Sequence, residues 1–158
     1  MAKRSTRADK GLQQALDRTA KLYANGDPAL FDYFAEDAIV YAVGSTEPFR
    51  GRNAYRKHFQ PILTAEKRKI SFLQQDVLNI DEGKAVVAQT AQITQGGVIA
   101  HIRQTMVWAS DDGGWKVQHV HTTLVGEPTP AKMPTSASAI KVINERIATV
   151  AAVLGVAQ

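Results

Sequence analysis

The fold of this chain is decided by the stretch YANGDPALFDYFAEDA at residues 23–38. It has the pattern of one helix ending and another beginning. Gly26 suits the left-handed position that closes a helix, Asp27 can cap the next helix, and proline favours the first turn. The sequence therefore predicts a short helix at Pro28–Ala35, followed by a compact strand at Ile39–Val43.

Helical patterns lie on both sides of this stretch. Before it, between Thr6 and Ala24, apolar residues recur at steps of three and four, which predicts an amphipathic helix. After it, a segment rich in Gly, Ser, Thr and Pro leads to a third helix at Asn53–Leu63. We expect this helix to break near Pro61, because proline removes a backbone donor.

From Lys69 onward the pattern changes to alternating, β-branched segments. Turn signals at residues 81–83, 96–97 and 111–114 divide them into four strands, at about 69–80, 84–95, 98–109 and 115–125. Helices followed by an antiparallel meander indicate an α+β domain, in which three N-terminal helices cover a curved antiparallel sheet.

The C-terminal part has a different composition. A Pro-rich linker at 127–137 precedes residues 138–158, which are predicted to form an amphipathic helix from Ser138 to Leu154. We expect this helix to dock on its own domain or on a partner subunit, since an isolated helix of this length is marginal in water. The remaining chain divides into a basic tail at 1–7 and one folded domain at 8–126.

Composition excludes several classes of function. The 158 residues contain no cysteine, which removes disulfides, thiolate nucleophiles and Cys-ligated metals. No P-loop or dinucleotide-binding motif is present, so we expect no cofactor. No export signal or long apolar segment is seen, so we expect a cytoplasmic protein without a membrane partner.

The net charge of +4 does not predict nucleic-acid binding, because four of the 19 basic residues lie in the first ten positions. Lys67–Lys69 is the only short basic run, and we interpret it as a solvated loop. It lacks the interleaved aromatic residues of a single-strand binding surface.

The histidines are the natural candidates for a metal or a general base. His119 and His121 lie two apart on a predicted strand and so share one face, a spacing that suits a metal. No third ligand is evident, which favours a hydrogen-bonding role at a subunit interface and no metal. His101 and Arg103 have the same parity on the neighbouring strand and are predicted to join them.

Four sequence stretches carry a family resemblance that spans about residues 8–126. The stretch 23–38 and Gly51-Arg-Asn-Ala-Tyr55 resemble the opening of nuclear transport factor two-like proteins. The patterns at 104–108 (QTMVW) and 114–121 (GWKVQHVH) are similar to the association domain of calcium/calmodulin-dependent protein kinase II and its stand-alone bacterial relatives. The resemblance implies a cone, whose concave sheet face lines a pocket and whose convex face is used in dimers.

The same resemblance argues against two specific activities. In ketosteroid isomerase, another member of the superfamily, an Asp base works with a Tyr and a protonated Asp. By alignment these three positions are held here by Ala42, Thr19 and Gln104, so that mechanism is disfavoured. The pocket arginines of the kinase association domain fall at Met106 and Thr122, which argues against an anionic ligand.

The concave face inferred from the resemblance is neutral and mainly apolar. Besides Thr19 and Ala42 it comprises Tyr23, His58, Phe59, Val87, Gln89, Gln104, Met106, Trp108, Gln118, Val120 and Thr122. This lining predicts an uncharged aromatic or polycyclic ligand. The alternative is that the three glutamines only satisfy one another in a core filled by side chains. A register slip of one residue would instead turn His101, Arg103, His119 and His121 inward.

Two functions follow from these predictions. The first is a small-molecule pocket protein of the SnoaL-like type, with or without a cofactor-free isomerase, lyase or cyclase activity in which His58 acts as general acid or base. The second is a non-catalytic oligomerisation module like the kinase association domain. In both cases we expect a homo-oligomer.

Overall fold

The computed structural model describes residues 9–132 and 136–153. Its helical elements are α1 (Lys10–Asn25), η1 (Pro28–Tyr33), α2 (Arg52–Ala65) and α3 (Ala137–Val153). Its strands are β1 (Phe34–Tyr41), β2 (Phe49–Arg50), β3 (Lys69–Asp81), β4 (Lys84–Gln95), β5 (Val98–Asp111), β6 (Gly114–Leu124) and β7 (Thr129–Pro130). The basic tail predicted at residues 1–7 lies outside the described residues.

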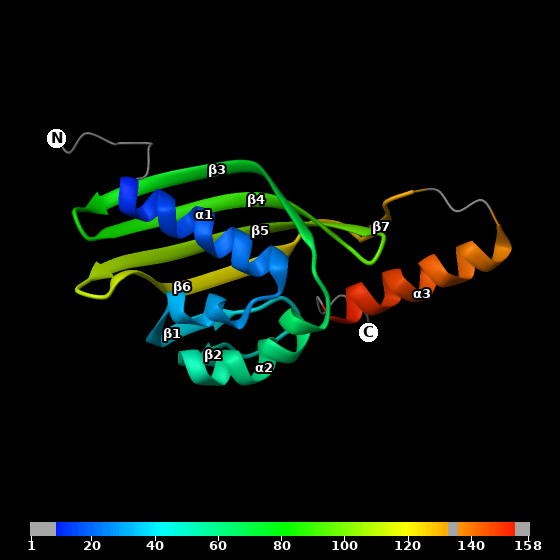
Figure 1. Ribbon diagram of the computed structural model, residues 1–158, viewed down its shortest axis with the longest axis horizontal. Helices are drawn as coiled ribbons and strands as arrows, with labels where there is room; N and C mark the ends of the chain where they lie inside the picture. The colour runs from blue at the N-terminus through cyan, green and yellow to red at the C-terminus, as the bar shows by residue number, and fades with distance from the viewer. Residues whose placement is uncertain (1–8, 133–135, 154–158) are drawn as a thin grey trace.

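Within the described residues, seven strands form one sheet in the order β2-β1-β6-β5-β4-β3, with β7 added beside β5. β1 runs parallel to β6, and the other pairs are antiparallel. Figure 1 shows α1 lying across the long strands, while η1 and α2 lie near β1 and β2 at one side. This confirms the predicted α+β fold, a curved sheet covered by N-terminal helices.

The turn between α1 and η1 is built as predicted. Gly26 has a φ of 67° and donates to the carbonyls at the end of α1, and the Asp27 side chain accepts a hydrogen bond from Ala29 N at 2.9 Å. At its start, α1 is capped by Asp9, which accepts from Leu12 N at 2.7 Å. Both ends of the helix that covers the sheet are therefore fixed locally.

Two predicted helix boundaries are wrong. The second helix is a 3₁₀ helix that stops at Tyr33, because Phe34 opens β1, pairs with Val117 and is buried. The third helix does not break at Pro61 but continues to Ala65. Burial of Leu63 in the core holds this last turn in place.

The four long strands are found where the sequence predicted them. Gln89 lies opposite Gln104, which lies opposite Thr122, so these three share one face of the sheet. An irregularity interrupts the β5–β6 ladder, where Val107 pairs with His119 but the next residue, Trp108, pairs with Val117. Residue 118 is thus an extra residue in β6, a β-bulge.

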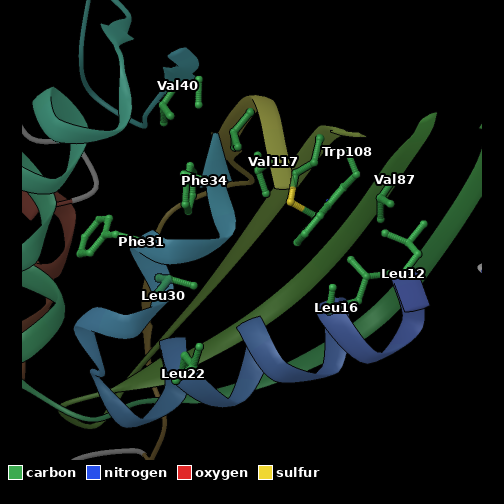
Figure 2. Close-up of a cluster of buried hydrophobic side chains, with 14 of the residues drawn as sticks. Leu12, Leu16, Leu22, Leu30, Phe31, Phe34, Val40, Val87, Trp108 and Val117 are labelled. Atoms are coloured by element: carbon green, nitrogen blue, oxygen red, sulfur yellow. The ribbon is translucent and has the colours of Figure 1, made fainter. Parts of the chain in front are cut away.

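The hydrophobic core lies between the concave face of the sheet and the helices α1, η1 and α2. Leu12, Phe31, Leu63, Val87 and Trp108 are each at most 1% exposed. Figure 2 shows Leu12 and Leu16 of α1 placed over the strands that carry Val87 and Trp108. Complete burial of one such aliphatic side chain contributes about 1.5–3 kcal/mol, so this layer fixes the helix on the sheet.

The basic run at residues 67–69 is not the fully solvated loop that the sequence predicted. Arg68 is only 6% exposed. Its guanidinium donates to the carbonyl oxygen of Tyr23 at 2.8 Å, to that of Leu63 at 3.0 Å and to that of Glu66 at 2.7 Å. The burial is tolerated because several donors are satisfied by carbonyl oxygens at helix ends.

The predicted C-terminal helix is present as α3 and extends away from the sheet (Figure 1). It contacts the domain near the β4–β5 turn, where Ile143 packs over Gly97 and Arg146 lies 3.3 Å from Glu66 Oε1. Ile140 and Val142 stay 45% and 57% exposed. No helix in the described residues is long and apolar enough to cross a membrane.

Candidate functional site

A cavity of about 170 Å³ lies between α1, α2 and the concave face of the sheet. Most of its wall is aliphatic or aromatic. None of the described residues that line it is Asp, Glu, Lys or Arg. The wall therefore offers no fixed charge to a bound molecule. Its polar groups are amides, hydroxyls, one imidazole and the indole N–H of Trp108, which is buried without a hydrogen-bond partner among the described residues.

Eleven of the predicted concave-face residues line this cavity: Thr19, Tyr23, Ala42, His58, Phe59, Gln89, Gln104, Met106, Trp108, Val120 and Thr122. Val87 is fully buried in the adjoining core. Gln118 was predicted to line the cavity as well, but it does not. The reason is the β-bulge, which displaces this residue from the alternation and brings Val117 to the cavity wall instead.

The polar floor of the cavity is a row of side-chain hydrogen bonds across the sheet. Gln75 Nε2 donates to Gln89 Oε1 at 2.9 Å, Gln89 Nε2 donates to Gln104 Oε1 at 2.7 Å, and Gln104 Nε2 donates to Thr122 Oγ1 at 3.0 Å. We call these four residues the amide ladder. It leaves the floor hydrogen-bonding but uncharged.

Two tyrosines, Tyr23 of α1 and Tyr55 of α2, face the cavity. Burial raises the pKa of Tyr55 above its ordinary value of 10.0, and the neighbouring Tyr23 raises it further. Burial also raises the pKa of Tyr23, an effect partly opposed by the positive charge of Arg68. Neither hydroxyl has a hydrogen-bond partner among the described residues, so both are neutral donors free to meet a ligand.

His58, the predicted acid or base, lies at the rim of the cavity. Its imidazole stacks on Phe49 with ring centres 4.4 Å apart and planes 24° apart. The side chain is exposed to solvent while also lining the cavity. This position allows proton exchange between bulk water and a molecule in the cavity mouth.

Several cavity residues were missed from the sequence. They include Tyr55, Ile62, Ile70 and Phe72. Tyr55 stacks on Phe59 with ring centres 5.3 Å apart, four residues along the same helix face. The helical spacing of Tyr55, Phe59 and Ile62 is the signal that marks this wall.

The convex-face residues predicted for an interface lie away from the cavity. His101, Arg103, His119 and His121 do not line it, which excludes the alternative register in which they point inward. His101 lies 3.2 Å from Gln92 Oε1. The Tyr41 ring lies 5.6 Å from the ring centres of both His119 and His121.

Comparison with known proteins places the chain in a family. Residues 12–125 match the SnoaL-like domain, and the chain belongs to this family. No protein with a curated function matches it significantly.

Solved structures share its fold. An NTF2-like protein of unknown function from Pseudomonas putida KT2440 is 19% identical, with 76% of this chain and 88% of that chain covered and a TM-score of 0.68. A proposed calcium/calmodulin-dependent protein kinase II association domain from Xanthomonas campestris is 22% identical, with coverage of 77% and 90% and a TM-score of 0.65. A proposed scytalone dehydratase from Novosphingobium aromaticivorans is 15% identical, with coverage of 80% and 89% and a TM-score of 0.68. The fold is thus that of the nuclear transport factor two-like superfamily.

Proposed function

We propose that this protein binds an uncharged, largely apolar aromatic molecule in the cavity between α1, α2 and the sheet. The observation that carries this proposal is a cavity wall without fixed charge, closed by the neutral amide ladder. The volume of about 170 Å³ matches a single ring, since a protein cavity of about 150 Å³ holds benzene.

The proposed chemistry, where the ligand is also a substrate, is a cofactor-free proton transfer of the lyase, isomerase or cyclase kind. His58 would exchange the proton, because an imidazole can act as a general acid and as a general base. The hydroxyls of Tyr23 and Tyr55 would donate hydrogen bonds to an oxygen of the reacting molecule. The fold neighbour proposed to be a scytalone dehydratase supports a reaction of this class.

The binding proposal is tested with acetophenone and ethylbenzene, two single-ring probes of nearly equal size. Titration followed by NMR should shift the indole N–H signal of Trp108 and the side-chain amide signals of the cavity floor. Ala42→Phe, which fills the cavity, should abolish these shifts. The matched control is Ala88→Phe on the other face of the sheet. If neither probe perturbs these signals, the cavity is not a ligand site.

A second candidate function is a non-catalytic oligomerisation module. The fold neighbour proposed to be a kinase association domain supports it, as does the convex face, where Tyr41 contacts His119 and His121. In this function copies of the chain pack through their convex faces, and the cavity holds only water. Either function is compatible with a homo-oligomer, so probe binding distinguishes them.

A further inference from the structure

The amide ladder joins four neighbouring strands in register. Gln75 of β3 lies opposite Gln89 of β4, which lies opposite Gln104 of β5, which lies opposite Thr122 of β6. Each residue donates to the next, and all three hydrogen bonds are 2.7–3.0 Å long. Donation therefore runs in one direction, from the edge strand β3 to the hydroxyl of Thr122.

The ladder leaves specific hydrogen-bonding groups unused. A Gln side chain has two N–H donors, and the ladder uses one donor each from Gln89 and Gln104. Thr122 accepts through Oγ1, and its own proton has no acceptor among the described residues. Because Gln89, Gln104 and Thr122 line the cavity, these unused donors are available to a bound molecule.

Among these donors, the hydroxyl of Thr122 is the one on which the row of hydrogen bonds ends. Successive hydrogen bonds polarise one another, and a hydroxyl that accepts a hydrogen bond becomes a better donor. The ladder ends on this hydroxyl after three bonds in the same direction. A carbonyl-type oxygen is the group that matches a neutral hydroxyl donor in a largely apolar cavity.

A carboxylate would fit this position poorly. No Lys or Arg lines the described cavity wall, and the nearest buried cation, Arg68, donates its hydrogen bonds to Tyr23, Leu63 and Glu66 carbonyls and to Gln95. Removing a carboxylate from water without a counter-charge is strongly unfavourable. A neutral ketone or amide oxygen carries no charge, so moving it from water into the same site costs much less free energy.

We infer that the amide ladder selects the ligand: the aromatic molecule of the proposed function carries an uncharged carbonyl-type oxygen, which accepts a hydrogen bond from Thr122 Oγ1. This inference rests on the proposed function and adds the chemical class of the ligand. Gln75, whose side chain reaches the cavity only through Gln89, is a positioning residue that fixes the direction of the ladder.

Three single-ring probes test the inference: acetophenone with a neutral oxygen, ethylbenzene without one, and benzoate with a charge. NMR titrations at pH 7 give a dissociation constant for each. One added neutral hydrogen bond changes affinity by about fivefold, so acetophenone should bind about fivefold more tightly than ethylbenzene. Benzoate should bind more weakly than either.

Variants locate the hydrogen bond. Thr122→Val removes the hydroxyl at nearly constant shape and should reduce the ratio of the two neutral affinities to about one. Thr122→Ser keeps the hydroxyl and should retain the ratio, and Thr123→Val on the exposed face is the matched control. Gln75→Met should lower the ratio of acetophenone to ethylbenzene affinity without weakening the binding of ethylbenzene. A merely structural loss would instead weaken the binding of both probes.

The outcomes separate this inference from the proposed function. If acetophenone and ethylbenzene bind equally, if benzoate binds best, or if Thr122→Val leaves the ratio unchanged, the inference is overturned while the cavity remains a ligand site. If no probe binds, the proposed function fails and this inference fails with it.

Discussion

Arg68 donates a hydrogen bond to the carbonyl oxygen of Tyr23 at 2.8 Å, and its guanidinium carbon lies 4.7 Å from the centre of the Tyr23 ring. The same guanidinium donates to the carbonyls of Ile62, Leu63 and Glu66 at the end of α2. One buried side chain therefore joins the C-terminal ends of α1 and α2. Both helices contribute residues to the cavity wall.

Replacement of Arg68 should destabilise the fold. Arg68→Met leaves helix-end carbonyls without donors, and each buried unsatisfied group costs about 1–3 kcal/mol. We expect a loss of about 3 kcal/mol in the free energy of unfolding, measured by urea denaturation. Lys67→Met at the exposed neighbouring position is the control. Equal stability of the two variants would contradict this role.

The fold could be predicted from the sequence because its signals are local and strong. Caps at Gly26 and Asp27 place the first turn, and period-two alternation places the four long strands. The family resemblance implied that Gln89, Gln104 and Thr122 share the concave face. In the structure all three line the cavity, since alternation continues without interruption along β4 and β5.

The errors arise where distant contacts override local preference. A β-bulge moves Gln118 off the cavity face, and no residue next to Gln118 in the sequence indicates that a bulge forms there. Arg68 belongs to a basic run that the sequence suggests is solvated. In the structure it is buried and donates hydrogen bonds to carbonyl oxygens at the ends of two helices. Tyr55 was seen only as part of a motif, because its place on the cavity wall depends on how α2 packs.

The buried tyrosine Tyr55 should make the fold sensitive to alkali. Its pKa is raised above 10.0 in the folded protein, so the folded state holds this proton more tightly than the unfolded chain. The corresponding stabilisation is complete below about pH 10 and is lost as the pH rises above it. Urea midpoints measured from pH 8 to 11 should fall more steeply for the wild type than for Tyr55→Phe. If the urea midpoints of the wild type and of Tyr55→Phe fall in parallel with pH, the folded state does not disfavour ionisation of this phenol. Tyr41→Phe on the exposed face serves as control.

His58 should be needed for chemistry but not for folding. Its side chain is exposed at the cavity rim, and exposed substitutions usually change stability by less than about 0.5 kcal/mol. His58→Ala should therefore keep the wild-type unfolding midpoint and bind acetophenone, but lose turnover of any compound that the cavity converts. Lys57→Ala, one position earlier on α2, should keep turnover. Unchanged turnover in the His58 variant would remove this residue from the mechanism.

The protein should sediment as a dimer or larger assembly at neutral pH. Its convex face presents Arg103, His119 and His121 on one side of the sheet, a set of groups suited to a hydrogen-bonded interface. The double variant His119→Ala/His121→Ala removes two of these groups and should shift the assembly towards the monomer. A single species near 17.2 kDa at neutral pH would rule out the proposed interface.

Helix α3 should stabilise the domain or its assembly. Ile143, Ile147 and Val150 are half-buried, and Arg146 pairs with Glu66 at 3.3 Å. Both partners of this ion pair are substantially exposed, so it contributes less than about 1 kcal/mol, and the apolar contacts matter more. The exposed Ile140 and Val142 on the same helix are expected to contact a partner subunit.

Truncation after Lys132 removes α3 but retains β7, which pairs with β5 through Val98 and Ile99. If the helix contributes about 1–2 kcal/mol, the melting temperature should fall by roughly 2–8 °C, since 1 kcal/mol corresponds to about 2–4 °C at this chain length. Truncation after Gly126 also removes β7 and should lower it further. Arg146→Ala removes only the ion pair and should lower the melting temperature less than either truncation does. If the chain cut after Lys132 keeps its melting temperature and its oligomeric state, and residues 138–153 of the full chain exchange amide hydrogens at random-coil rates, the helix does not dock and its exposed isoleucine and valine have no partner to meet.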